Sequence, residues 1–130
     1  MGKVIHFEIP AADPKRAAEF YSEVFGWKIE KYPGGQMDYW LVTAGSDKEP
    51  GINGAIAIKD ETHPTTINTI SVPSFEDASK AIKQKGGKVL TPKMAIPNVG
   101  YMAYCKDPEE NLFGIMQMDP NAKMEQAVST

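Results

Sequence analysis

The feature that most constrains this chain is an internal repeat with a period of about sixty residues. Glu8–Pro10 precedes the first predicted helix as Ser71–Pro73 precedes the second, and Gly26–Ile29 matches Gly86–Val89 after the helices. Each half alone is too small to bury a core, whereas two halves can bury the apolar faces of their helices against one sheet. The repeat therefore predicts an α+β fold of two tandem βαβββ modules.

Hydrophobic periodicity assigns the elements of the first module. Lys3–Ile9 alternates like a strand, which Pro10 is expected to end. Asp13 is the predicted N-cap of a helix with Pro14 at its first position, and Gly26 suits the end of that helix. The other strands of this module are expected at residues 27–30, 38–44 and 54–59.

The second module follows the same order. Ile67–Val72 is predicted to be a strand, and Ser74 with Asp77 resembles a capping box that starts the second helix. Gly86 and Gly87 should end this helix. Further strands are expected at residues 88–91, 101–106 and 112–116. We expect one domain over residues 1–118, with modules at 3–60 and 66–117, and a polar tail at 119–130.

The composition excludes several functional classes. Of the 130 residues, 42% are hydrophobic and 24% are charged, as in ordinary globular proteins. The formal net charge of -3 offers no basic surface, so we expect neither a nucleic-acid nor a membrane partner. Cys105 is the only cysteine and is predicted to be buried and unreactive. No secretory signal or membrane-spanning stretch is visible, which favours the cytoplasm.

One face of the predicted sheet is the candidate site. Alternation along the first strand directs its apolar residues to the helix and leaves His6 and Glu8 on the opposite face. In the second module it leaves Ile67, Thr69 and Ser71 facing away from the helix. A sheet with helices on one face has its other face open to water, a partner or a ligand. His6 and Glu8 are therefore candidate catalytic residues; the alternative is that both are merely solvated or hydrogen-bonded.

Several segments together carry a family resemblance. In order and spacing, the chain resembles the vicinal oxygen chelate superfamily, which includes glyoxalase I, bleomycin-resistance proteins and extradiol dioxygenases. The matching segments are Phe7–Pro10, Asp13–Tyr21, Val24–Trp27, Ile70–Val72, Gly86–Val89 and Lys106–Phe113. Glu110 departs from the glycine usual in its turn. The resemblance covers residues 3 to 117 and implies a curved mixed sheet around a cavity, and a homodimer.

The resemblance also implies His or Glu metal ligands on four inner strands. Carried across, His6 falls on the first of these positions, and Ala57, Ile67 and Gly114 fall on the others. The side chains of Ala, Ile and Gly cannot bind a metal, and a catalytic site needs about three protein ligands. We therefore predict no metal and no other cofactor, with a divalent metal bound through His6 as the alternative.

Small residues at the former ligand positions predict an apolar pocket for a small molecule. The substrate-binding candidates are Trp40, Ala57, Ile67, Thr69, Tyr101, Tyr104, Gly114 and Met116, and Tyr39 lies on a strand that should border the same pocket. For each aromatic side chain the alternative is packing in the core.

Three functions stay open at this point. The first is a protein that binds a small apolar or aromatic molecule without turnover, as the resemblance to the bleomycin-resistance branch implies. The second is a glyoxalase-like lyase or isomerase, or a dioxygenase-like oxidoreductase, with His6 or Glu8 as general base. Such an enzyme would work without a metal, or with a divalent metal that is held in a displaced site built from His6, Glu8 and His63. The third is an interaction domain whose open sheet face binds another subunit.

Overall fold

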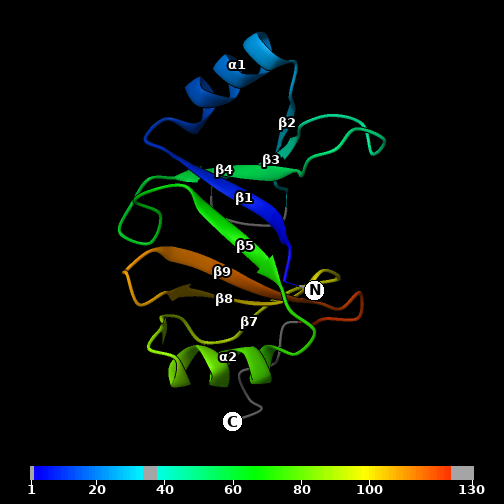
Figure 1. Cartoon of the computed structure of the whole chain (residues 1–130). Coiled ribbons are helices and arrows are strands. Elements are labelled where there is room, and N and C mark those ends of the chain that lie inside the picture. Colours follow the sequence, from blue (N-terminus) through cyan, green and yellow to red (C-terminus); the bar gives the residue numbers. More distant parts are fainter. Residues whose placement is uncertain (1, 34–37, 124–130) are drawn as a thin grey trace. The chain divides into compact units, whose positions relative to one another are not determined.

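The computed structural model of the chain describes residues 2–33 and 38–123, which belong to two compact units (Figure 1). The N-terminal unit contains Ile5–Ile67. The C-terminal unit starts at Asn68 and also includes the residues that precede Ile5. Each unit combines parallel and antiparallel strand pairs with one helix, which confirms the predicted α+β fold of two repeated modules.

The N-terminal unit has a βαβββ order. Its elements are β1 (Val4–Ala11), α1 (Pro14–Phe25), β2 (Lys28–Lys31), β3 (Tyr39–Thr43) and β4 (Gly54–Ile58). The strands are arranged in the order β2–β3–β4–β1. β1 and β4 run parallel, and β3 pairs antiparallel with both β2 and β4. A side chain on β3 therefore reaches a side chain on β1 only across β4.

Helix α1 begins and ends where its local sequence predicts. The Asp13 side chain accepts a hydrogen bond of 3.1 Å from the backbone N–H of Arg16, and Pro14 occupies the first turn. Gly26 ends the helix with φ +74°, in the left-handed region that glycine adopts without strain. These caps satisfy polar groups that the helix itself leaves unbonded, so they fix its boundaries.

One face of β1 packs against the core under α1. Phe7 and Ile9 join the apolar cluster around Ile56, which is completely buried. Because side chains alternate along a strand, His6 and Glu8 lie on the opposite face, as predicted.

The end of β1 differs from the prediction. The strand continues through Pro10 to Ala11 instead of ending at Ile9. The carbonyl of Ala11 accepts a hydrogen bond of 2.9 Å from the N–H of Lys59, so the polar groups of Ala11 point toward the β4 side. The backbone polar groups of Pro10 point away from β4. Proline lacks an N–H, but at this position no hydrogen bond to β4 is lost.

The C-terminal unit repeats this order with one additional strand. Its elements are β5 (Ile67–Ser71), α2 (Phe75–Gln84), β6 (Lys88–Val89), β7 (Met94–Ile96), β8 (Gly100–Lys106) and β9 (Leu112–Met118). The strands are arranged in the order β5–β9–β8–β6, and β7 also pairs with β8. β5 and β9 are parallel, whereas β8 is antiparallel to its partners.

Helix α2 covers a core that contains the single cysteine. The Ser74 side chain accepts from the N–H of Asp77 at 3.1 Å, which confirms the predicted start of the helix. Cys105 is completely buried in a cluster with Phe75 and Ile115. Burial raises the pKa of the Cys105 thiol to about 11, so it stays protonated, as expected of an unreactive cysteine. Within the described ranges, neither helix is long and apolar enough to cross a membrane.

Strand β7 was not predicted. The sequence predicts no strand between residues 88–91 and 101–106, but Met94–Ile96 forms one, and Pro92 and Pro97 flank this strand rather than interrupt it. At the start of the polar tail, the N–H of Asp119 donates to the carbonyl of Val99 at 2.9 Å. The first residues of the tail are thus held on the unit, and residues 124–130 lie outside the described part of the chain.

The turn between β8 and β9 contains Glu110, which stands where the resemblance implies a glycine. The Asp107 carboxylate accepts from the N–H groups of Glu109 and Asn111, at 2.8 and 2.9 Å. Glu110 has φ +70°, a left-handed conformation that favours glycine. The backbone therefore keeps a glycine geometry although glycine itself is replaced.

Gly54 supplies a test of the contact between β4 and β1. A Cβ at Gly54 would lie 2.6 Å from Cδ1 of Phe7 and would also meet the Phe7 backbone. We expect Gly54→Ala to lower the free energy of unfolding by about 1–3 kcal/mol, measured by urea denaturation, because the strands must move apart. Gly45→Ala is the control, since its Cβ meets only the flexible end of Glu49. Equal stability of the two variants would contradict this packing.

Candidate functional site

Glu8 is the polar residue around which the site is built. Its position on β1 directs it away from the apolar cluster, yet only 3% of the residue is exposed. A buried carboxylate is costly unless donors replace the water that solvated it. The residues that bond to Glu8 therefore define the site.

Tyr39 on β3 supplies the first donor. Its hydroxyl donates to Oε2 of Glu8 at 2.5 Å, although β4 lies between the two strands. Tyr39 is paired with Ala57, and Glu8 with Ala55, so two methyl groups face the same side as the hydrogen bond. Both alanines are buried. A larger side chain at either position would block the hydroxyl from the carboxylate, so the small residues serve the internal contact.

His63 supplies the second donor from the loop that follows β4. Its Nε2 lies 2.9 Å from Oε1 of Glu8, and the two side chains are 15% and 4% exposed. Asp60 shapes this loop, because its Oδ1 accepts from the N–H groups of Thr62 and His63 at 2.9 and 3.0 Å. The loop is therefore folded on itself where it presents the imidazole to Glu8.

His6 extends the hydrogen-bonded chain on β1. Its Nε2 lies 2.8 Å from the hydroxyl of Tyr39, and the two rings stack with an interplanar angle of 20°. An ionised carboxylate only accepts, so Tyr39 donates to Glu8 and its oxygen accepts from Nε2–H of His6. This assignment places the lone pair of neutral His6 on Nδ1.

The two histidines are shifted in opposite directions. Burial lowers the pKa of His6, and the charge of Glu8 opposes this only in part. The hydrogen bond to Glu8 raises the pKa of His63, against the effect of desolvation. Near neutral pH, His6 is therefore held as the neutral base, and the imidazolium of His63 is favoured beside the carboxylate.

This arrangement is suited to proton transfer. A proton taken up at Nδ1 of His6 makes an imidazolium, whose Nε2–H points through the Tyr39 hydroxyl to the Glu8 carboxylate. In general base catalysis by histidine, a buried carboxylate commonly orients the imidazole and stabilises the charge that it gains on protonation. The group of His6, Glu8, Tyr39 and His63 is called the relay below.

A metal site at the positions that the resemblance implies does not fit this chain. The side chains of Ala57, Ile67 and Gly114 carry no donor atom. Nε2 of His6, at the remaining position, is hydrogen-bonded to Tyr39. Within residues 2–33 and 38–123, no group of three or more His, Cys, Asp or Glu side chains is placed to hold a metal ion.

The alternative, displaced metal site does not fit either. His6 is connected to Glu8 through Tyr39, and His63 bonds to Glu8 directly. These hydrogen bonds engage Nε2 of both histidines and both carboxylate oxygens, so the three side chains are held to one another rather than arranged around an ion. The metal and cofactor content of the protein itself stays a prediction.

Two substrate-binding candidates lie in the N-terminal unit. Ala57 is 4% exposed on the face that carries the relay. Trp40 packs with the cluster around Ile56, on the helix side of its strand, so core packing describes it better than the pocket. Its Nε1 is buried and has no hydrogen-bond partner in the described part of the chain.

The other candidates lie on β5, β8 and β9. Tyr104, Gly114 and Thr69 are paired in one row across these strands, and a Cβ at Gly114 would lie 2.9 Å from Oγ1 of Thr69. Met116 belongs to the same face, because Ile115 beside it faces the core under α2. Tyr101 packs against that core instead. Ile67 is completely buried.

Sequence reasoning named Tyr39 and His63 but missed their role. Tyr39 was expected only to border a pocket, and His63 only to join a displaced metal site. Their partner Glu8 is 31 residues from Tyr39 and 55 residues from His63 in sequence. The one sequence signal for a relay was the pair His6 and Glu8 on the open face of β1.

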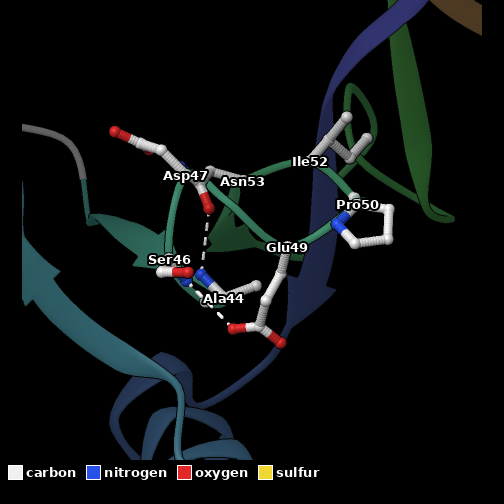
Figure 2. Close-up of a pocket in the computed structure, with 9 residues that line it drawn as sticks. Ala44, Ser46, Asp47, Glu49, Pro50, Ile52 and Asn53 are labelled. Carbon is white, nitrogen blue, oxygen red and sulfur yellow. Dashed lines mark hydrogen bonds between the residues drawn. The ribbon is translucent and has the colours of Figure 1, made fainter.

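A hollow lies in the loop between β3 and β4, and none of its lining residues belongs to the relay (Figure 2). It has a volume of about 170 Å³ and is lined by residues 44–47 and 49–53. Figure 2 shows the Glu49 side chain turned toward the backbone of Ser46. The Oε1 atom of Glu49 accepts a hydrogen bond of 3.1 Å from the N–H of Ser46. Asn53 accepts from the N–H of Ala44 at 3.0 Å. These polar groups stabilise the loop itself.

A family model and two related proteins all point to glyoxalase-type proteins. The family model of the Glyoxalase/Bleomycin resistance protein/Dioxygenase superfamily matches residues 3–115. A glyoxylase-like domain-containing protein of Didymella fabae is 29% identical over 118 residues, or 88% of this chain and 92% of the relative. CFP32 of Mycobacterium bovis, a glyoxylase by name, is 26% identical over 85% of this chain, which spans 43% of that protein.

Solved structures share the fold at low sequence identity. A variant of Streptomyces coelicolor methylmalonyl-CoA epimerase, in complex with 2-nitronate-propionyl-CoA, has a TM-score of 0.67 and 12% identity, over 95% of this chain and 99% of that one. A superfamily member from Vibrio splendidus has a TM-score of 0.63 and 12% identity, over 92% of this chain and 100% of its own. At these identities the likeness concerns the fold alone.

The hydroxyl of Tyr39 is tested by Tyr39→Phe. This change leaves the bond to Oε2 of buried Glu8 unmade, so we expect a loss of about 1–3 kcal/mol in the free energy of unfolding. Tyr32→Phe is a matched control, because the Tyr32 ring meets that of Tyr39 edge-on, with centroids 6.3 Å apart. Urea denaturation measures both variants, and an equal change in the two would contradict the assigned bond.

The two pKa shifts predict a stability maximum near the ordinary histidine pKa of about 6.5. The raised pKa of His63 contributes stability that is lost as pH rises through its folded value. The lowered pKa of His6 contributes stability that is lost as pH falls through its folded value. In denaturation at several pH values, His63→Gln should flatten the alkaline side and His6→Gln the acidic side. An unchanged alkaline slope in His63→Gln would refute the charge assignment.

Proposed function

The chain belongs to the glyoxalase/bleomycin resistance protein/dioxygenase superfamily, and we propose that it is an enzyme that moves a proton on a small carbonyl compound. His6 is the proposed general base, and the reaction does not require a metal. The observation that carries this proposal is the buried carboxylate of Glu8, which is hydrogen-bonded through Tyr39 to a neutral histidine. Family membership supplies the scaffold, whereas the relay supplies the chemistry.

The proton transfer follows from the tautomer of His6. Nδ1 takes a proton from a carbon next to a carbonyl group, and the C–H electron pair moves into the enolate, whose negative charge resides largely on oxygen. The imidazolium then returns the proton to the opposite face of the same carbon, once the planar enolate has turned over in the site, or to a neighbouring atom. These outcomes are an epimerisation and an isomerisation, and neither needs an oxidant or a reductant.

The residues around His6 lower the barrier in distinct ways. Burial keeps His6 neutral before the reaction, so it is ready to accept a proton. Glu8 stabilises the imidazolium through Tyr39 once the proton has moved. The names of the relatives support this class, since they include glyoxylases and an epimerase of a coenzyme A thioester.

Binding of an apolar molecule without turnover is the second candidate. It is favoured by the row of Tyr104, Gly114 and Thr69, in which an aromatic ring, a glycine and a hydroxyl group share one face of the C-terminal unit. Met116 on the same face would adapt to ligands of different shape. A ligand that binds but exchanges no proton would identify this function.

Deuterium exchange tests the enzyme directly. Protein treated with EDTA is incubated in D₂O with methylmalonyl-CoA and with a panel of aldehydes and thioesters that carry an acidic C–H next to a carbonyl group. We expect loss of the C–H signal in proton NMR for at least one compound, and a rate about 10²–10⁴-fold lower in His6→Gln. Tyr32→Phe serves as the control. Exchange that survives unchanged in His6→Gln, or that appears only when a metal is added, would contradict the proposal.

A further inference from the structure

We infer that the outer face of α1 binds a second copy of the same chain, with the two α1 helices antiparallel across a two-fold axis near Phe20. A two-fold interface is self-complementary, because the same surface of both copies takes part in it. Exposed apolar side chains, unpaired charges and the order of those charges along α1 support this partner. The surface shares no residue with the relay, so it is separate from the proposed function.

Large apolar side chains are exposed on α1. Phe20, Val24 and Phe25 are 55%, 56% and 60% exposed. The rings of Phe20 and Phe25 both contact Tyr21, with centroids 5.2 and 6.1 Å apart, and Tyr21 in turn stacks on Trp27 at 4.8 Å. Aromatic side chains that are ordered before binding lose little entropy in an interface. Helix α2, which the structure describes over its whole length, exposes no large apolar side chain in this way.

The charges on α1 run in the order that a helix by itself disfavours. Beyond the N-cap Asp13, the first turn holds the basic Lys15 and Arg16, and the last turn holds Glu23. The helix dipole favours acidic side chains at the N-terminus and basic ones at the C-terminus. Helix α2 follows this rule, with two acidic residues in its first turn and a lysine in its last. The exposed Lys15, Arg16, Glu19 and Glu23 form no ion pair with any described residue.

A second α1 helix that runs in the opposite direction complements this order. Arg16 is four residues before Phe20 and Glu23 is three residues after it, so the three side chains lie on one face of the helix. When two copies cross antiparallel at Phe20, Arg16 of each copy lies beside Glu23 of the other, and the two Phe20 rings meet in the centre. The two-fold axis thus forms both ion pairs at once. A parallel pair would place Arg16 opposite Arg16 and is disfavoured.

The size of this face predicts a weak dimer. Helix α1 has 12 residues and is therefore about 18 Å long. One helix against another buries less than the roughly 800 Å² per partner that a stable interface of standard size needs. We therefore expect a dissociation constant in the micromolar range, to which a single pair of charges contributes measurably.

Charge reversal tests this arrangement, with sedimentation velocity over a range of protein concentrations as the measurement. Arg16→Glu or Glu23→Arg alone places like charges opposite each other twice, so the dissociation constant of the dimer should rise about tenfold. The double variant Arg16→Glu/Glu23→Arg forms both pairs with the charges exchanged and should dimerise like the parent protein. Lys80→Glu, at an exposed position of α2, is the control and should leave the dissociation constant unchanged.

Phe20→Glu provides the second measurement. It places two carboxylates at the centre of the contact, so this variant should be monomeric at every concentration at which the parent protein dimerises. Circular dichroism checks that the substitution, at an exposed position, leaves the fold intact. A parent protein that stays monomeric up to millimolar concentration would overturn the inference and leave the face to a different partner. A dimer that Phe20→Glu leaves intact, or a double charge variant that stays as weak as the single ones, would overturn it as well.

Discussion

The burial of one negative charge, on Glu8, is the constraint on which the candidate site depends. Transfer of an ion from water into a protein costs several kcal/mol even after relaxation, and only well-placed donors offset this cost. The chain provides the hydroxyl of Tyr39 and the imidazole of His63. One donor comes from a strand and the other from a loop, so the carboxylate ties two separate segments of the N-terminal unit to β1.

Small residues on β4 make this arrangement sterically feasible. Ala55 and Ala57 lie on β4, between β3 and β1. Their methyl groups are small, so the Tyr39 side chain can pass over them and its hydroxyl can reach Glu8. Of the two, Ala57 suggests in the sequence a space left for a ligand. In the folded unit they serve an internal hydrogen bond, and both are buried. Interpreting a small residue therefore requires knowing which side chains pass over it.

The relay separates two histidines that share one carboxylate. Direct contact with Glu8 favours the charged form of His63, whereas burial favours the neutral form of His6. Such a pair, with pKa values moved apart by their surroundings, is a common basis for assigning acid and base roles. In a superfamily whose scaffold supports several kinds of chemistry, these local effects bear on function more directly than the fold does.

Local chemistry determined the parts of the structure that the sequence predicted by itself. Asp13 and Gly26 delimited α1 because caps act within one turn, and alternation along β1 placed Glu8 away from the core because side-chain direction repeats every two residues. The tertiary structure alone decided that Glu8 meets Tyr39 and His63. Those contacts depend on strand order and register, and on a loop conformation that Asp60 sets, and none of these is encoded by nearest neighbours in the chain.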